Sequence, residues 1–279
     1  MRSWCDDRRS GDEMTEVHPT AIVDPKAQIA QDVAVGPYCV VGPNVVLDTG
    51  VVLHSHVVIQ GRTTVGARTQ IYSFASIGHP PQDLKYKGEP STLDIGTDNL
   101  IREHVTMNPG TEGGGMQTRV GNHCAFLASA HVGHDSIIGD HVVFSNNVML
   151  AGHCKIGDFV IFGGGAALHQ FGRVGKHAFV GGMSAVENDV IPYGLVVGNR
   201  AHLMGLNLIG LKRRGFSREQ IQAMREAYGV LFSEEGTLRE RVEIAASRFA
   251  DHPEVMDIVN FIRAESDRAI CMPRHDRAA

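Results

Sequence analysis

Two histidines and an aspartate lie close together in the short segment Ala130–Asp135. His131 and His134 are three residues apart, and Asp135 directly follows His134. A carboxylate beside an imidazole can accept one ring N–H, fix the tautomer and leave the other ring nitrogen as a base near neutral pH. The segment therefore predicts a site that takes a proton from a hydroxyl, as is needed when a sugar hydroxyl attacks a thioester.

These side chains lie within a six-residue repeat that predicts the fold. A helix of 3.6 residues per turn cannot keep a period of six on one face, and the glycine that often follows the repeated position would break a long strand. The pattern instead indicates a triangular β-solenoid, in which each hexad forms one short strand and a corner, 18 residues close a coil, and about eight coils stack. The apolar positions of the repeat are Val23, Ile29, Val35, Val41, Leu47, Leu53, Ile59, Val65, Ile71, Ile77, Ile95, Ile101, Met107, Val120, Phe126, Val132, Ile138, Phe144, Leu150, Ile156, Phe162, Leu168, Val174, Val180 and Val186.

The period of 18 residues predicts which polar side chains meet. It places Asp135 over His153 and His134 over Gly152, whose backbone N–H is suited to a developing oxyanion. One histidine alone would be an ordinary surface residue of a coil, whereas several on one region of the prism indicate a site. The predicted cluster consists of His131, His134, Asp135, His153, His169 and Gln170.

Two segments, residues 78–94 and 109–118, depart from the repeat. Long excursions from a regular scaffold are commonly binding loops. The first carries Asp83 and Lys85, a charge pair suited to polar groups of a ligand, although a solvated loop with incidental charges has the same composition. The second contains three consecutive glycines, but it lacks the strand–loop–helix context of a phosphate-binding loop, so we reject that interpretation.

After Pro192 the repeat stops, and residues 200–279 are predicted to be helical. Capping-box patterns at Ser217 and Thr237 open two helices, and Pro253 fits the first turn of a last one. Leu203 to Arg213 is expected to be a short amphipathic segment that ends near Gly215. The adjoining basic cluster Lys212-Arg213-Arg214 is either a solvated helix face or a docking site for an acidic carrier or a diphosphate.

Charge and composition narrow the class of protein. The net charge is −5, with 19 acidic and 13 basic residues up to residue 199 and 12 acidic and 13 basic residues after it. This excludes wholesale nucleic-acid binding and directs an acidic partner to the C-terminal part. There is no apolar run long enough to span a membrane and no signal-peptide core in the polar tail 1–14, so we expect a cytoplasmic protein, with Met14 as an alternative start. Five cysteines without close spacing argue against a disulfide framework.

Several stretches together resemble the UDP-N-acetylglucosamine 3-O-acyltransferases, a family of hexapeptide-repeat acyltransferases that depend on acyl carrier protein. The similarity runs from about residue 15 to about residue 265. The matching stretches are Phe74–Gly78, Pro81–Tyr86, Ala130–Asp135, Leu150–His153, Ala167–Phe171, Val180–Gly182 and Gly210–Arg218.

The resemblance implies a left-handed parallel β-helix over residues 15–199 with a C-terminal α-helical domain over 200–279, and it implies homotrimers. It implies transfer of an (R)-3-hydroxyacyl chain from acyl carrier protein to the 3-hydroxyl of UDP-N-acetylglucosamine, the first step of lipid A biosynthesis. The transfer would be direct, without a metal or another cofactor.

The resemblance also implies roles for individual residues. His134 would be the general base and Asp135 its orienting carboxylate, with His131, His153, His169 and Gln170 lining the site. Asp83 and Lys85 would hold the sugar, Asn207 and Arg213 would contact the nucleotide, and Gly182 would stand where acyl length is measured. A glycine there favours a longer chain than a bulky residue would.

Two departures from the family pattern are present, Asn108-Pro109 in place of a His-Arg pair and Ile209 in place of a frequent Glu. They leave open a modified sugar nucleotide. An alternative from another class is a zinc-dependent hydratase like the γ-class carbonic anhydrases, with His131, His134 and His153 as ligands across a subunit interface. A related hexapeptide-repeat acyltransferase and a purely structural prism are the remaining alternatives.

Overall fold

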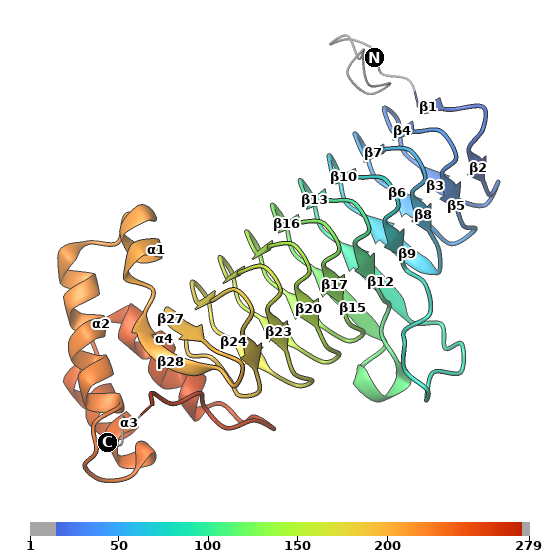
Figure 1. Cartoon of the computed structure of the whole chain (residues 1–279). Helices are drawn as coiled ribbons and strands as arrows, with labels where there is room; N and C mark the ends of the chain where they lie inside the picture. Colours follow the sequence, from blue (N-terminus) through green and yellow to red (C-terminus); the bar gives the residue numbers. More distant parts are fainter. Residues whose placement is uncertain (1–14, 275–279) are drawn as a thin grey trace.

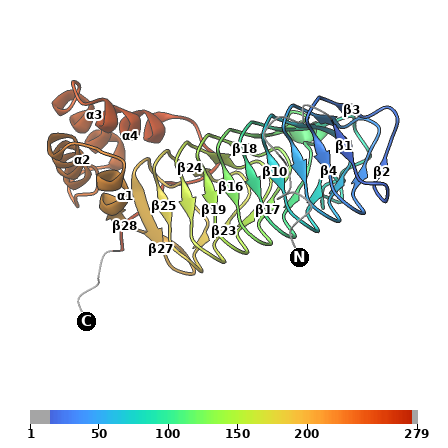
Figure 2. The ribbon, with the colours of Figure 1, turned by 90° about the horizontal axis from the view of Figure 1, so that it is seen from above.

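The computed structural model describes residues 15–274, which form a long triangular prism with a group of helices at one end (Figures 1 and 2). Each coil contributes one short strand to each of three sheets in turn, and successive coils pair in parallel. Ala125 pairs with Val143, 18 residues further along the chain. The predicted triangular solenoid is thus confirmed. The polar tail 1–14, with Cys5 and Met14, lies outside the described residues.

The three sheets form the three sides of the prism. The first sheet consists of β1 (Glu16–Val17), β4 (Ala34–Val35), β7 (Val52–Leu53), β10 (Gln70–Ile71), β13 (Leu100–Ile101), β16 (Ala125–Phe126), β19 (Val143–Phe144), β22 (Ile161–Phe162), β25 (Phe179–Val180), β27 (Gly194–Val197) and β28 (His202–Leu206). The second consists of β2 (Ile22–Val23), β5 (Val40–Val41), β8 (Val58–Ile59), β11 (Ser76–Ile77), β14 (Thr106–Met107), β17 (His131–Val132), β20 (Met149–Leu150), β23 (Ala167–Leu168) and β26 (Ala185–Val186). The third consists of β3 (Gln28–Ile29), β6 (Val46–Leu47), β9 (Arg62–Val65), β12 (Thr92–Ile95), β15 (Gln117–Val120), β18 (Ile137–Ile138), β21 (Lys155–Ile156) and β24 (Arg173–Val174).

The prism is longer than the repeat predicted. Ten parallel strands of the first sheet, β1 to β27, lie on successive coils among the described residues, where about eight coils were expected. The repeat begins one hexad earlier, at Val17, and continues past Val186 to Val196, which pairs with Val180. The last strand, β28, then turns back and runs antiparallel to β27.

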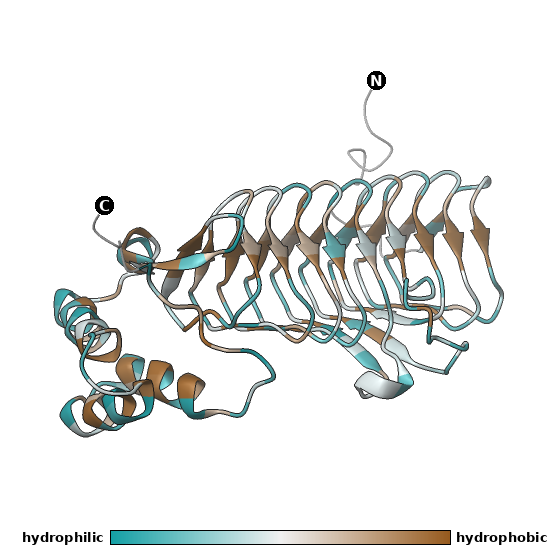
Figure 3. Ribbon diagram, turned by 60° about the horizontal axis from the view of Figure 1, so that its bottom comes forward, coloured by the Kyte–Doolittle hydropathy of each residue, from teal (hydrophilic) through white to brown (hydrophobic). Residues whose placement is uncertain are grey.

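The interior is filled by the repeated apolar position, so the prism has a packed core. Most strands are hydrophobic and most of the connecting corners are hydrophilic (Figure 3). Phe126, Phe144 and Phe162 stack along the axis of the prism and are fully buried. Their rings meet edge to face, with centroids 5.2 Å and 4.9 Å apart. A ligand must therefore bind to an outer face.

Three corners join the sheets: corner I leads from the first sheet to the second, corner II from the second to the third, and corner III from the third to the first. Many corners carry a residue other than glycine in the left-handed conformation, such as His56 and His141, with φ of 60° and 57°. On successive coils these residues lie above one another. At corner III the rings of His141, Phe159 and His177 stack with centroids 4.6 Å and 4.8 Å apart.

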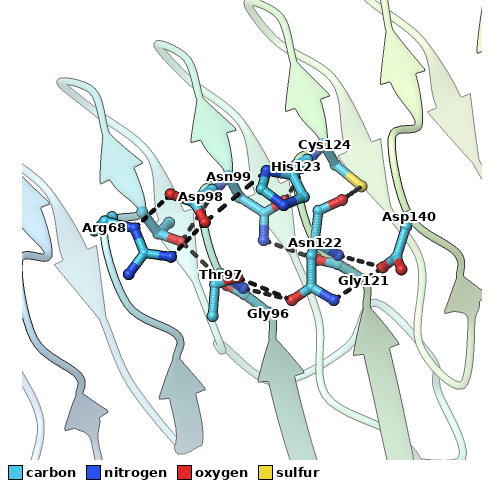
Figure 4. A network of polar contacts seen from close by, with 11 residues as sticks. Arg68, Gly96, Thr97, Asp98, Asn99, Gly121, Asn122, His123, Cys124 and Asp140 are labelled. Atoms are coloured by element: carbon cyan, nitrogen blue, oxygen red, sulfur yellow. Dashed lines mark hydrogen bonds and ion pairs between the residues drawn. The ribbon is translucent and has the colours of Figure 1, made fainter.

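The two excursions leave the coil register intact, although they lengthen their coils to 30 and 25 residues. Strands β12 and β15 begin at Thr92 and Gln117, so each excursion ends slightly earlier than predicted. Polar contacts at corner III tie the lengthened coils to their neighbours (Figure 4). Arg68 binds Asp98 through two hydrogen bonds of 2.7 Å and 2.6 Å. One coil further, the buried Asn99 accepts from Cys124 N at 2.7 Å.

The C-terminal part begins with a strand, which the sequence did not predict. Residues 202–206 form β28, so the expected helical segment from Leu203 is wrong over its first half, because these residues complete the open edge of the first sheet. The helices follow as α1 (Leu208–Arg213), α2 (Arg218–Leu231), α3 (Leu238–Arg248) and α4 (Pro253–Arg263). Both predicted capping boxes, at Ser217 and Thr237, are confirmed, as is Pro253 in the first turn of α4.

After α4 the chain returns to the last coils of the prism (Figure 1). Ile270 forms a parallel bridge with Asp189, whose N–H and C=O bind the backbone of Ala269 and Cys271 at 2.8 Å each. The Asp189 side chain is fully buried and binds Arg173 and Ser266, at 2.7 Å and 2.6 Å. The C-terminal segment is therefore part of the prism.

Because Phe144 stands between two other core rings with no solvent exposure, Phe144→Ala leaves a cavity that short strands cannot close. We expect it to lower the free energy of unfolding by about 3–5 kcal/mol. Chemical denaturation at one fixed protein concentration measures this. Ile244→Ala, at a side chain of α3 that is 55% exposed, is the control and should cost less than about 0.5 kcal/mol. Equal losses in the two variants would contradict the packed core.

Candidate active site

The predicted proton-transfer residues gather at corner II. His131 is on β17 and faces outward from the second sheet, and His134 and Asp135 form the turn that follows. His134 and Asp135 are almost completely buried, with 7% and 6% exposure. The His134 Nδ1 lies 2.8 Å from Asp135 Oδ2. The carboxylate thus fixes the imidazole so that Nε2 is left to exchange a proton.

Asp135 is held by the second excursion. Thr111 donates to both carboxylate oxygens, from its backbone N–H to Oδ1 at 2.8 Å and from its hydroxyl to Oδ2 at 2.6 Å. The backbone N–H of Asp135 donates to the hydroxyl of Thr118 at 2.8 Å. Asp135 itself has φ of 60°, a conformation that Asp tolerates better than most residues. These bonds stabilise the ionised carboxylate and fix its direction.

Two glycines allow the backbone to pack closely on the side chains of Asp135 and His134. A Cβ at Gly114 would lie 2.0 Å from the Asp135 carboxylate carbon, so close packing on Asp135 explains the glycine at this position. A Cβ at Gly152 would lie 2.6 Å from both Cε1 and Nε2 of His134. The predicted stacking of His134 over Gly152 is therefore confirmed, and the reactive nitrogen lies directly against the backbone of the next coil.

His153 and His131 flank the pair. The Nδ1 of His153 is 3.8 Å from Asp135 Oδ2, and its ring stacks on Phe171 at 4.5 Å. Burial lowers the pKa of His153, while Asp135 opposes this effect. Burial, helped by the charge of His134, also lowers the pKa of His131. Both flanking imidazoles are thus favoured in their neutral form.

The first excursion brings its charges to the same corner. Asp83 and Lys85 both act electrostatically on His153, Asp83 raising and Lys85 lowering its pKa. The Asp83 carboxylate also accepts the backbone N–H of Lys85 at 3.0 Å, which fixes the turn between them. Asn108, one of the two departures from the family pattern, is buried and donates to His79 O at 3.0 Å, so it anchors the base of this excursion.

His169 and Gln170 lie further along corner II, where the segment that follows α4 reaches them. Gln170 follows His134 by two 18-residue coils. Arg268, from the returning C-terminal segment, donates to His169 Nδ1 at 2.5 Å and to the backbone oxygen of Gln170 at 3.0 Å. The sequence did not identify this arginine.

The other predicted site residues lie elsewhere on the prism. Asn207 and Arg213 line a cavity of about 690 Å³ against the first sheet, the side opposite corner II. Asn207 caps α1 by accepting from Gly210 N at 3.1 Å, and Ile209 is 69% exposed at this cavity. Gly182 lies at corner I, and a Cβ there would meet only Gly164 O, at 3.3 Å, and Gly164 N, at 3.8 Å. Within one chain, these residues do not join the histidines.

One group of side chains among the described residues could share a metal ion: His134, Asp135 and His153, with ligand atoms within 4.8 Å of one another. His131, which the zinc alternative requires, is not in this group. Its Nδ1 lies 2.7 Å from the hydroxyl of Thr106. The donor set therefore differs from the three histidines that this alternative predicted.

Comparison with known proteins decides the family. A family model described as UDP N-acetylglucosamine O-acyltransferase, domain 2, matches residues 189–271. The acyl-[acyl-carrier-protein]–UDP-N-acetylglucosamine O-acyltransferase of Methylobacterium radiotolerans is 71% identical over 74% of this chain and 75% of its own length. That of Azorhizobium caulinodans is 52% identical over 92% of this chain and 95% of its own length. This chain belongs to the family of UDP-N-acetylglucosamine O-acyltransferases.

Solved structures agree with this assignment. The crystal structure of the UDP-N-acetylglucosamine O-acyltransferase of Moraxella catarrhalis has a TM-score of 0.88 and 40% identity, covering 91% of this chain and 99% of its own. The predicted family, the O-acyltransferase class and the left-handed β-helix are confirmed, and the zinc hydratase is not favoured. Within residues 15–274, no helix is long and apolar enough to cross a membrane.

The sequence missed the residues that hold the site together, namely Thr111, Thr118 and Arg268. Thr111 stands in the second excursion, which has no repeat to predict its position. Arg268 follows His169 by 99 residues, and only the folded helices bring the two together. The one available signal was the glycine run beside Thr111, which indicated close packing on an unknown neighbour.

Thr111→Val removes the hydroxyl donor to Asp135 and keeps the size of the side chain. Because a hydrogen bond to a buried carboxylate contributes about 1.5–3 kcal/mol, we expect kcat for acyl transfer to fall roughly 10- to 100-fold. Steady-state kinetics measures this. Thr64→Val, on the outer face of β9, is the matched control. An unchanged kcat in Thr111→Val would show that the carboxylate does not depend on this bond.

Proposed function

We propose that this chain transfers an (R)-3-hydroxyacyl group from acyl carrier protein to the 3-hydroxyl of UDP-N-acetylglucosamine, the first step of lipid A biosynthesis, with His134 as the general base. The observation that carries the assignment of the base is the buried His134–Asp135 pair, joined at 2.8 Å with Nε2 left for proton transfer. The relatives at 71% and 52% identity, which are named for this reaction, support the substrates.

The reaction needs no covalent enzyme intermediate. The 3-hydroxyl oxygen attacks the thioester carbon while Nε2 of His134 takes the hydroxyl proton. The resulting oxyanion collapses, the carbon–sulfur bond breaks, and the carrier's thiolate leaves and receives the proton from His134. The Asp135 carboxylate, whose oxygens are held by Thr111, stabilises the transient imidazolium of His134.

Gly152 is the proposed oxyanion donor. Its neighbours Ala151 and His153 donate their N–H groups to backbone oxygens of Leu168 and His134, at 3.1 Å and 2.8 Å. Within residues 15–274, the Gly152 N–H donates to no backbone carbonyl. It therefore remains for a ligand, directly beside the reactive nitrogen of His134.

The outer face of the second sheet is the proposed path of the acyl chain. This face connects corner II, where the base lies, with corner I, where Gly182 lies. Beyond His131 its outward residues are Met149, Ala167 and Ala185, which are apolar and mostly small. The chain can therefore lie flat against this face, with its far end near Gly182.

The active unit is a homotrimer in this proposal. Corner II carries the base and the proposed sugar contacts, whereas the cavity with Asn207 and Arg213 lies on the opposite side, against the first sheet. One ligand can reach both only if corner II of one copy lies against the first sheet of the next. Such a head-to-tail contact closes into a ring, and a threefold ring suits a three-sided prism.

Two surface features support this contact. The outward side chains of the first sheet are apolar from Leu100 onward, on a prism whose third sheet faces outward largely with polar groups. Leu84, between Asp83 and Lys85, is fully exposed in the single chain. The apolar outward residues of the first sheet are Leu100, Ala125, Val143, Ile161, Phe179 and Leu195.

His134→Ala removes the base without adding bulk. We expect kcat for transfer from a 3-hydroxyacyl carrier thioester to fall roughly 10²- to 10⁴-fold, the contribution typical of general-base catalysis. Light scattering after size-exclusion chromatography should give the same trimer mass as the unmodified protein. Turnover within a few-fold of the unmodified enzyme would exclude His134 as the base.

Gly182→Met tests the acyl path. A Cβ at this position would lie 3.3 Å from Gly164 O, a tight contact that a shift of a few tenths of an ångström relieves, so the coil should be kept. We expect the preferred acyl chain to shorten by several carbons, measured by mass spectrometry of products from a mixed panel of acyl-carrier thioesters. Ser184→Ala, at a buried position that faces inward on the same coil, is the control and should keep the original preference. An unchanged product distribution in Gly182→Met would place the chain elsewhere.

A further inference from the structure

The segment that follows α4 places the guanidinium of Arg268 at corner II. Hydrogen bonds to the last coils of the prism hold this segment in place. The buried Asp189 binds the Ser266 hydroxyl at 2.6 Å, and that hydroxyl accepts the backbone N–H of Arg268 at 3.2 Å. The parallel bridge between Asp189 and Ile270 holds the other side of the arginine. Arg268 is thus fixed on both sides and half-buried over the last coils.

The two contacts of Arg268 decide which nitrogen of His169 carries the proton. A guanidinium only donates hydrogen bonds, so the His169 Nδ1 that meets it at 2.5 Å must be the acceptor. A neutral imidazole with Nδ1 as acceptor carries its proton on Nε2. His169 is therefore held as a hydrogen-bond donor through Nε2.

The same arginine disfavours the competing tautomer, because an Nδ1–H group would face the N–H groups of the guanidinium. The backbone oxygen of Gln170 lies 3.4 Å from His169 Nδ1 and is the nearby acceptor for an Nδ1–H group. Arg268 Nε occupies this oxygen at 3.0 Å. Without the arginine, Nδ1 can donate to Gln170 and Nε2 becomes an acceptor.

The coil spacing separates this histidine from the bond that reacts. Gln170 stacks two coils beyond His134, a separation of about 10 Å at about 4.8 Å per coil. His169 can therefore contact a bound substrate but not the atoms that exchange the proton at His134. Its donor nitrogen suits an acceptor oxygen of the substrate.

We propose that Arg268 is a positioning residue that fixes His169 as the Nε2–H tautomer, so that His169 donates a hydrogen bond to an oxygen of the bound substrate. The part that concerns substrate binding rests on the proposed function. The tautomer does not, and it can be measured in the full chain without any substrate.

The first experiment is nitrogen NMR of the full-length protein labelled with ¹⁵N at histidine, with His169→Gln used to assign the signals. We expect Nδ1 of His169 to have the shift of an unprotonated nitrogen and Nε2 that of a protonated one. In Arg268→Gln the two should exchange character or average. Arg268→Lys, which keeps a charged donor, should restore the original pattern at least in part.

The second experiment is steady-state kinetics of the same variants with UDP-N-acetylglucosamine and a 3-hydroxyacyl carrier thioester. Loss of one hydrogen bond should raise KM for one substrate roughly 2- to 10-fold, with a smaller change in kcat. Arg263→Gln, an exposed arginine of α4 paired with Glu243, is the control and should match the unmodified enzyme.

Cys271 reports whether the segment stays docked. Its thiol is 1% exposed and burial raises its pKa to about 11, so it should resist alkylation in the unmodified protein and in Arg268→Gln, with the modified site located by peptide mass spectrometry. Rapid alkylation of Cys271 in the variant would reduce Arg268 to an anchor of the segment and overturn the proposal. So would an unchanged His169 tautomer. If transfer activity is absent from the unmodified protein, the proposed function fails while the tautomer result still stands.

Discussion

Each corner of the prism demands a sharp turn, and at most corners the chain meets this demand with a residue in the left-handed conformation. For residues other than glycine that conformation costs roughly 1–2 kcal/mol, and this chain accepts it at many corners. The cost is offset because the turn residues of successive coils lie above one another and their rings stack, as His141, Phe159 and His177 do. The active site uses the same positions, since Asp135 and His153 are both left-handed turn residues of corner II. In the proposed mechanism, the chemistry is therefore carried by residues that the backbone already holds in a single direction.

The repeat alone does not make this site. Three segments outside the repeat converge on corner II, each supplying something that a regular coil lacks. The second excursion places Thr111 on the Asp135 carboxylate, the first excursion brings Asp83 and Lys85 near His153, and the C-terminal segment places Arg268 on His169. The coils set where these side chains stand, and the irregular segments supply the hydrogen bonds and charges around them.

The extent to which the sequence predicts this molecule follows the same division. The period of six predicted the sheets, the inward side chains and the stacking of His134 over Gly152, because each depends only on counting residues. Helix starts at Ser217 and Thr237 were predictable, because capping is local. Strand β28 was not predictable. It forms because it pairs with β27 at the open edge of the first sheet, and the local sequence pattern does not reveal that edge. The contacts of Thr111 and Arg268 were not predictable either, because both residues lie in segments that do not follow the six-residue repeat. The placement of Asn207 and Arg213 on a side away from the histidines was equally hidden, since it depends on where α1 packs.

The docking of the C-terminal segment also bears on the order in which the enzyme matures during synthesis. Coils of the prism contact mainly their immediate neighbours, so they can stack one after another as the chain leaves the ribosome. His134, Asp135 and Thr111 come together early in that sequence. The arginine that contacts His169 is 99 residues later in the sequence, and all four helices are synthesised before it. A partly synthesised chain can thus form the His134–Asp135 pair before His169 has its arginine. The far end of corner II is complete only when the segment with Arg268 has docked.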